Sequence, residues 1–181
     1  MLRFEMAKEK DLEAVWSLFL RVKEDLESKG NTMWSHGYPR KKDFQETLDD
    51  GSLTLIYDDE RLIGSYGYMF DVAAYYFDGE TAEVEAKKML QAIGCDNGRP
   101  NLILERFFLD PSYQGKGIGS QVMKHIDETF PNHNLVYAVF KINEAGIAFY
   151  KKHGFQECTQ TFPWGWGKYN VTCTLLYRPA F

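Results

Sequence analysis

The chain carries the stretch Gln114-Gly115-Lys116-Gly117-Ile118-Gly119, followed by Ser120, between two segments of regular pattern. The apolar run from Leu102 to Leu109 predicts a strand before it, and the amphipathic segment from Gly119 to Phe130 predicts a helix after it. Glycines let backbone N–H groups turn toward one anion, and a helix N-terminus adds partial positive charge. The stretch therefore predicts a site for a pyrophosphate group.

Two other phosphate-binding loops fit the stretch less well. The P-loop requires a glycine, four residues and then Gly-Lys-Ser/Thr, and that spacing is not present. The dinucleotide fingerprint Gly-x-Gly-x-x-Gly would begin at Gly115, where Ser120 occupies the position of the third glycine. That fingerprint also belongs to the first strand and helix of a parallel sheet, whereas roughly 100 residues precede it here. This context argues against NAD, and a plain structural turn stays open as the alternative to a phosphate loop.

A second block lies downstream. The run from Leu135 to Phe140 predicts another strand, and residues 143–155 predict a short helix that ends at Gly154. The blocks at residues 110–119 and 143–155 together resemble those of the GCN5-related N-acetyltransferase (GNAT) family. The resemblance implies one N-acetyltransferase domain over residues 1–181, with an α+β fold whose mixed, mostly antiparallel central sheet is flanked by helices.

The resemblance also implies acetyl-CoA as the acyl donor. Gln114, Gly117 and Gly119 fill the family's acyl-CoA motif, and the backbone N–H of Leu109 takes the position that contacts the thioester carbonyl. Asn143 also stands at a position of cofactor contact. The whole set implied for the cofactor is Phe107, Leu109, Gln114, Gly115, Lys116, Gly117, Ile118, Gly119, Ser120, Asn143 and Tyr150.

Amine acetylation needs a base, because an alkyl ammonium ion is almost entirely protonated at neutral pH and cannot attack a thioester. Glu105 lies on the predicted strand, on the face shared with Ile103 and Phe107, and it resembles the glutamate that serves as base in some family members. The alternative is a salt bridge at the rim of the site, with Arg106 or Arg99. Glu105 is thus the candidate base, and this second interpretation stays open beside it.

Tyr150 is the candidate acid. It stands at the family's proton-donor position, and a phenol is protonated at pH 7, so it can supply a proton to the departing thiolate. The alternative is that this ring packs against the neighbouring strand, as expected for Phe149.

Composition limits the classes of partner. The chain of 181 residues is 44% apolar and 26% charged, and no run of eighteen apolar residues could span a membrane. The first five residues lack the features of a secretory signal, so a cytoplasmic protein is expected. The net charge of −5, with one short basic run at residues 40–42, argues against nucleic acid as a partner.

Metal sites and disulfides are not predicted. His125, His133 and His153 do not have the spacing of metal ligands. The three cysteines are odd in number and widely spaced, at Cys95, Cys158 and Cys173.

The flanking segments complete an α+β order of elements. Before the glycine stretch, the predicted elements are a strand at Leu2 to Glu5, a helix that ends at Gly30, a helix at Lys41 to Asp50, and a hairpin of Ser52 to Asp58 and Arg61 to Phe70. The apolar face of the first helix consists of Leu12, Val15, Trp16, Phe19, Val22 and Leu26. At the end of the chain, strands are predicted near Phe155 to Phe162 and Lys168 to Tyr177, around a turn at residues 163–167.

Residues 71–100 interrupt the family's usual tight connection. Gly79 to Ile93 predicts an added helix, followed by a turn at residues 96–98. A segment of this length exceeds an ordinary loop, so it is expected to form a lid or a contact in a homodimer, and both interpretations stay open.

Trp34, His36 and Tyr38 lie between the first two helices, where the family commonly builds its acceptor wall. Trp34 and Tyr38 are therefore candidate substrate-binding residues, and packing in the core is the alternative. The expected function is acetyl transfer from acetyl-CoA to a primary amine of a small molecule, by direct attack in a ternary complex. Acetylation of a protein lysine or N-terminus, or a non-catalytic acyl-CoA-binding regulatory module, are the alternatives.

Overall fold

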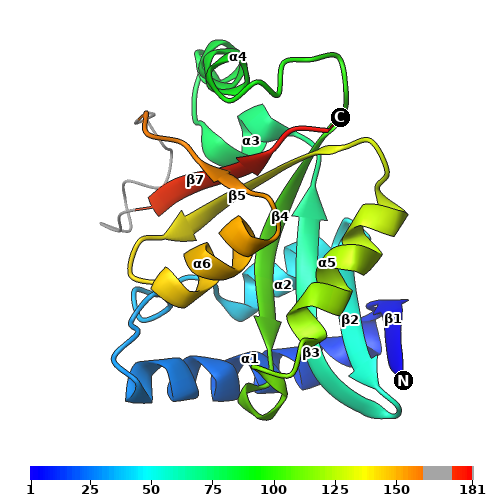
Figure 1. The fold of residues 1–181 in the computed structure, drawn as a ribbon. Coiled ribbons are helices and arrows are strands. Elements are labelled where there is room, and N and C mark those ends of the chain that lie inside the picture. Colours follow the sequence, from blue (N-terminus) through cyan, green and yellow to red (C-terminus); the bar gives the residue numbers. More distant parts are fainter. Residues whose placement is uncertain (161–172, 181) are drawn as a thin grey trace. The chain divides into compact units, whose positions relative to one another are not determined.

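A computed structural model describes residues 1–160 and 173–180 (Figure 1). The elements in chain order are β1 (Leu2–Met6), η1 (Glu9–Asp11), α1 (Leu12–Ser28), α2 (Lys41–Asp49), β2 (Leu53–Asp58), β3 (Arg61–Met69), α3 (Val72–Tyr76), α4 (Ala82–Ala92), β4 (Asn101–Leu109), η2 (Pro111–Tyr113), α5 (Ile118–Thr129), β5 (Asn134–Phe140), α6 (Glu144–Lys152), β6 (Gln156–Glu157) and β7 (Cys173–Arg178).

The strands follow the order β1-β2-β3-β4-β5-β7-β6. Antiparallel ladders join β1 to β2, β2 to β3, β5 to β7 and β6 to β7, whereas β4 and β5 pair in parallel. This mixed, mostly antiparallel sheet confirms the predicted fold class. The parallel ladder is short, from Asn101 opposite Asn134 to Ile103 opposite Val136.

The chain forms two compact units, which are described separately. Unit 1 consists of Met1–Tyr68 and Leu104–Lys124, and unit 2 of Met69–Ile103 and His125–Phe181. The expectation of one domain over residues 1–181 stays a prediction.

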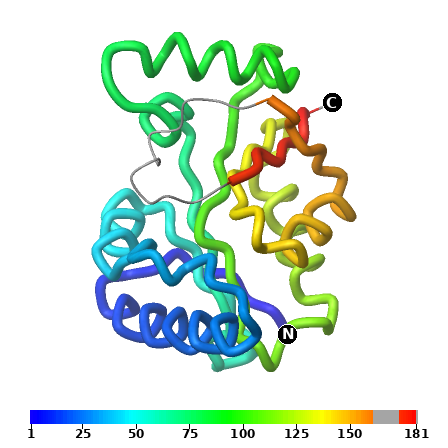
Figure 2. Tube along the Cα trace, turned by 90° about the vertical axis from the view of Figure 1, so that its left-hand side faces the viewer, coloured from blue at the N-terminus to red at the C-terminus, as the bar shows by residue number. Residues whose placement is uncertain are grey.

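Unit 1 is organised by the apolar face of α1. Val15, Phe19 and Val22 are fully or almost fully buried at helical spacing. The Phe19 ring lies 5.2 Å from that of Phe44 on α2 and 5.6 Å from that of Phe108 on β4. In Figure 2, α1 and α2 lie on the same side of β2 and β3. The predicted first helix and its buried face are thus confirmed, although Trp16 and Leu26 are only partly buried.

Unit 2 incorporates the added segment into its core. The predicted helix is present as α4, but the short α3 before it was not predicted. Buried residues of both helices, including Tyr76 and Met89, form one cluster with Ile103 of β4, Val136 of β5 and Leu175 of β7. Residues 71–100 therefore contribute to a packed core, with one apolar face covered by strands.

The end of the chain departs from the predicted strands. β6 covers only two residues of the strand predicted at Phe155 to Phe162, with one further hydrogen bond from the Cys158 N–H to the Leu175 carbonyl (2.8 Å). Residues 161–162, the turn predicted at 163–167 and the start of the strand predicted from Lys168 lie outside the described residues.

Asn134, the first residue of β5, is a buried polar centre of unit 2. Its Nδ2 lies 3.0 Å from the Cys95 carbonyl and 2.9 Å from Oδ1 of Asn101, and its Oδ1 accepts from the Ala180 N–H at 2.8 Å. Its own N–H donates to the Pro100 carbonyl at 2.9 Å. One side chain thus joins the end of the added segment, the start of the parallel ladder and the C-terminal segment.

We expect Asn134→Ala to lower the free energy of unfolding by about 2 to 3 kcal/mol, because it leaves several buried groups without a hydrogen-bond partner. Urea unfolding followed by circular dichroism measures this change. Lys87→Ala, at an exposed position on α4, is the matched control. A loss no greater than that of the control would contradict the central role of Asn134.

Candidate active site

The glycine stretch forms an open turn between η2 and α5. Gly115 and Gly117 adopt φ angles of 71° and 77°, in the left-handed region that glycine occupies at little cost. A Cβ at either position would meet no atom within 4 Å. The Gly117 carbonyl accepts from the Gln121 N–H at 3.3 Å, so the helical hydrogen bonds begin at this residue. The turn presents backbone to solvent at a helix N-terminus, which suits an anion.

Polar contacts hold the base of this turn. Nε2 of Gln114 donates to the Leu109 carbonyl at 3.0 Å. Asp110 accepts from the backbone N–H and hydroxyl of Ser112 at 2.9 and 2.6 Å, and from Arg61 at 3.2 Å. Burial raises the pKa of Asp110, but the hydrogen bonds from Ser112 and the charge of Arg61 outweigh it, so the pKa lies below its ordinary value.

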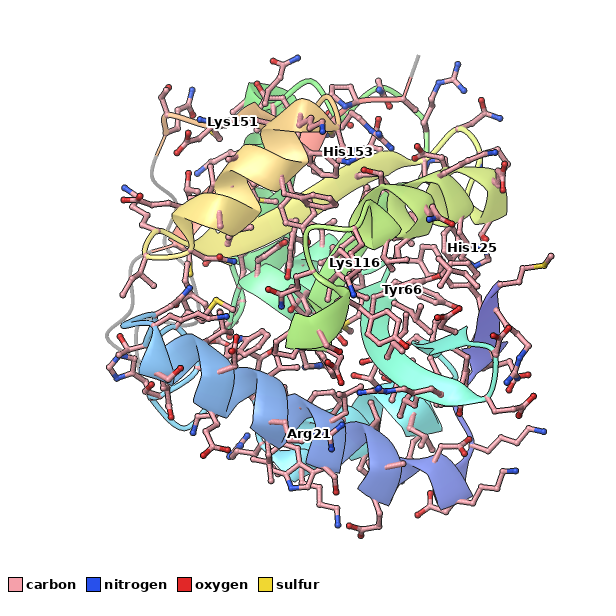
Figure 3. The ribbon with its side chains drawn as sticks, turned by 60° about the horizontal axis from the view of Figure 1, so that its bottom comes forward. Arg21, Tyr66, Lys116, His125, Lys151 and His153 are labelled. Carbon is pink, nitrogen blue, oxygen red and sulfur yellow. The ribbon has the colours of Figure 1, made fainter. Side chains whose placement is uncertain are left out.

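Cationic groups lie beside the same turn. The Lys116 ammonium is 5.6 Å and the Arg61 guanidinium 5.4 Å from the centre of the Tyr113 ring. Figure 3 shows Lys116 at the start of α5, whose first residues are Ile118, Gly119 and Ser120. Open backbone, a helix N-terminus and neighbouring cations together fit the pyrophosphate of a coenzyme A derivative.

Glu105 is buried on β4, with 1% of its side chain exposed. Its Oε1 accepts from the Thr47 hydroxyl at 2.8 Å and from Nη2 of Arg106. Among the described residues, Oε2 has no hydrogen-bond partner. The salt bridge with Arg106 is therefore present, but it is buried and not at an exposed rim. The catalytic role of Glu105 stays a prediction.

A break in strand alternation brings these groups together. Arg106 has a φ of 46°, which is rare for a residue with a side chain and typical of a bulge in a strand. Strict alternation predicts opposite faces for Glu105 and Arg106, yet both contact Thr47 of α2. The shared face predicted for Glu105 and the half-buried Phe107 assumes regular alternation, which the positive φ of Arg106 interrupts. The contact with Thr47 was not predicted, because nothing in the sequence indicates this conformation of Arg106.

Tyr150 lies in unit 2, buried on α6. Its ring lies 4.8 Å from that of Tyr137 on β5 and 5.3 Å from that of Phe155. Burial, followed by the charge and hydrogen bond of Tyr137, raises the pKa of Tyr150 well above its ordinary value. The phenol is therefore protonated at neutral pH. It also packs against the neighbouring strand, so its role as proton donor stays a prediction.

Asn143 begins α6 as its N-cap. Its Oδ1 accepts from the Gly146 N–H at 3.1 Å, which satisfies one of the free donors of the first helical turn. Lys151, at the other end of the helix, pairs with Glu157 at 2.5 Å. The cofactor contact expected for Asn143 stays a prediction beside this structural role.

Trp34 and Tyr38 have different surroundings in unit 1. Trp34 is buried, with its ring 4.9 Å from Phe19 and 6.3 Å from Phe108, as in the packing alternative. Tyr38 is half-buried, and its hydroxyl accepts from Nη1 of Arg106 at 2.9 Å. Contact with the acceptor stays a prediction for both residues.

The described residues contain neither a cluster of metal ligands nor a membrane-spanning helix. No group of three or more His, Cys, Asp or Glu side chains in residues 1–160 and 173–180 is arranged to hold a metal ion. In Figure 3, His125 lies on α5 and His153 at the end of α6. None of the helices in the same ranges combines the length and apolar character needed to cross a lipid bilayer.

A model of the acetyltransferase (GNAT) family matches residues 19–155. This chain belongs to the GNAT family. The matched range includes the turn at Gly115 and Gly117, Glu105 and Tyr150. The match does not test the roles of these residues.

Solved GNAT structures share the fold. An acetyltransferase of the family from Streptococcus agalactiae superposes with a TM-score of 0.75 at 14% identity, over 99% of this chain and 96% of that one. The PaiA N-acetyltransferase of Thermoplasma acidophilum, solved in complex with coenzyme A, gives a TM-score of 0.65 at 14% identity, over 99% of each chain. At such identities the likeness shows the fold alone.

A relative in Bacillus subtilis is named spermine/spermidine N(1)-acetyltransferase. It is 29% identical over 85 residues, which are 45% of this chain and 56% of the relative. The chain thus spans about half the length of the curated relatives that it matches.

The raised pKa of Tyr150 predicts a loss of stability at alkaline pH. The unfolded chain ionises this phenol near pH ~10, whereas the folded chain keeps it protonated to higher pH. The stabilisation of the folded chain by this phenol is therefore fully present below pH ~10 and is lost as the pH rises through the folded-state pKa. We expect the free energy of unfolding of Tyr150→Phe to fall less steeply than that of the wild type above pH 10. Urea unfolding at pH 7 gives the reference difference between the two proteins, and equal slopes would contradict the prediction.

Proposed function

We propose that this acetyltransferase transfers the acetyl group of acetyl-CoA to a primary amine of a small, polycationic acceptor, by direct attack in a ternary complex. The observation that supports acetyl-CoA as the acyl donor is the open turn at Gly115 and Gly117, where two residues without side chains precede an α-helix. The relative that is named for acetylation of spermine and spermidine supports the acceptor class. A cytoplasmic location and a homodimer stay predictions.

The proposed reaction forms a bond between the amine nitrogen and the acetyl carbon and breaks the bond between that carbon and sulfur. The nitrogen must lose a proton, and the departing thiolate takes one to become a thiol. Glu105 is the group of unit 1 assigned to accept the first proton. Tyr150 of unit 2 is assigned to donate the second, since its raised pKa keeps the phenol protonated.

Charge supports a cationic acceptor. The net charge of −5 attracts polycations over distances comparable to the Debye length, and this attraction weakens as salt rises. The same charge repels coenzyme A, so the cofactor depends on local donors at the turn beside Lys116 and Arg61. An acidic protein with a local anion site is consistent with binding two substrates of opposite charge.

We expect Gly117→Glu to weaken acetyl-CoA binding by about 2 kcal/mol or more. The structure leaves open space for a Cβ, so the loss arises from the left-handed φ and from a carboxylate placed near the pyrophosphate. Isothermal titration calorimetry gives the affinity. Gly79→Glu, at another open glycine of left-handed φ, is the matched control. Unchanged affinity in folded Gly117→Glu protein would exclude the turn as the pyrophosphate site.

We expect Tyr150→Phe to lower kcat by roughly 10²-fold with little change in acetyl-CoA affinity, because it removes only the proton donor. Thiol release from acetyl-CoA measures turnover with spermidine, spermine and a lysine-containing peptide. Polyamines should be the better acceptors, with kcat/KM falling as salt rises. Turnover of the peptide alone would favour a protein acetyltransferase, and no turnover of any amine would contradict the proposed function.

A further inference from the structure

The buried pair of Glu105 and Arg106 is polarised toward one carboxylate oxygen. Oε1 receives both the Thr47 hydroxyl and the guanidinium, whereas Oε2 has no hydrogen-bond partner among the described residues. A buried charged oxygen without a donor is costly, and native structures retain few of them outside sites of function. Oε2 is thus the carboxylate oxygen for which the described residues supply no donor.

The donors on Oε1 form a connected network. Nη2 of Arg106 donates to both Glu105 and the Thr47 hydroxyl, and Nη1 donates to the Tyr38 hydroxyl at 2.9 Å. The Thr47 hydroxyl carries one proton, for which the Asp43 carbonyl at 3.0 Å competes with the carboxylate at 2.8 Å. The carboxylate is the stronger acceptor because it is charged. Arg106 therefore orients Glu105 directly and through Thr47.

Gly67 of β3 provides the space for this arrangement. A Cβ at Gly67 would lie 2.7 Å from Oε1 and 2.9 Å from Cγ of Glu105, closer than real atoms approach. Ser65, two residues earlier on β3, is also buried, and its hydroxyl has no partner among the described residues. The geometry around the carboxylate thus depends on a specific neighbour in each of α2, β3 and β4.

We propose that Arg106 is the positioning residue for Glu105: with Thr47 it holds Oε1 and leaves Oε2 as the oxygen that receives the proton of the acceptor ammonium. This inference rests on the proposed function. Arg106 is assigned to act through Glu105, so its loss should affect turnover and the pH at which the base works more than it affects cofactor binding.

Other charges near the pair come from the start of α2. Asp43 pairs with Arg40 at 3.0 Å. Burial raises the pKa of Asp43, but its hydrogen bonds with Arg40 and the charges of Arg40 and Arg106 outweigh this, so the pKa lies below its ordinary value. Asp43 is therefore ionised across the neutral range, so its titration does not account for a change of activity there.

The test compares steady-state kinetics of Arg106→Lys, Arg106→Met, Thr47→Val and Glu105→Gln with the best amine of the panel. We expect Arg106→Met and Thr47→Val to lower kcat by roughly ten-fold or more at constant KM for acetyl-CoA. In Arg106→Met the acid limb of kcat/KM should move to higher pH, because a carboxylate that loses its cation holds a proton more tightly. Arg106→Lys should keep the limb near that of the wild type.

Arg3→Met is the matched control, since it breaks an exposed Arg–Glu pair on β1 of the same unit and should leave kcat unchanged. If Arg106→Met does not fold, Thr47→Val still carries the test, because it preserves volume and the ion pair. If the wild type is active and the changes at Arg106 and Thr47 alter neither kcat nor the acid limb, the positioning role of Arg106 is overturned and the proposed function stands. A wild type that acetylates no amine would overturn the proposed function and this inference with it.

Discussion

The short parallel ladder between β4 and β5 is the constraint from which the candidate site follows. Two parallel neighbours cannot be joined by a tight hairpin, so the chain needs a crossover connection that usually contains a helix. Here the crossover consists of η2, the glycine turn and α5. The start of α5 therefore follows the carboxyl end of β4, which is the end of a strand where open α/β sheets commonly bind ligands. The place of the candidate anion site is a consequence of how the sheet is connected.

Asn134 fixes the start of that ladder within unit 2. A buried amide that meets several backbone groups tolerates few alternatives, because a shift in register would leave those groups without partners. The parallel pairing is therefore specified by hydrogen bonds as well as by the apolar residues Leu102 and Leu135.

The buried pair on β4 is better explained by chemistry than by stability. Removing two charges from water costs several kcal/mol per ion, and a well-packed apolar pair is often as stable. The strand also contains a positive φ at Arg106, which a regular strand avoids. A polar cluster that combines these costs with a vacant carboxylate oxygen is typical of a site that must meet a charged ligand.

Local signals predicted much of the fold. The 3.6-residue period of α1, the apolar runs of β4 and β5, and the glycine turn before α5 are properties of neighbouring residues, and each is confirmed. The contacts of Thr47 and the hydrogen bonds of Asn134 join residues far apart in sequence, and no local pattern indicates them. The positive φ of Arg106 has no signal in the sequence either. Trp34 shows the same limit, since an aromatic loop residue has the same appearance in a sequence whether it faces a ligand or Phe19.

Packing also restricts how the added segment can act. Tyr76 and Met89 are fully buried in the cluster with Ile103, Val136 and Leu175, and exposing one such side chain costs about 1.5 to 3 kcal/mol. A lid that lifted α3 and α4 as one body would lose several of these contacts at once, so such an opening would be rarely populated. Deleting residues 71–100 would likewise uncover the core of unit 2, so a loss of activity could not be distinguished from a loss of folding. A role of this segment as a lid or a dimer contact is therefore better sought in its exposed residues, such as Val84 on α4, which is 54% exposed.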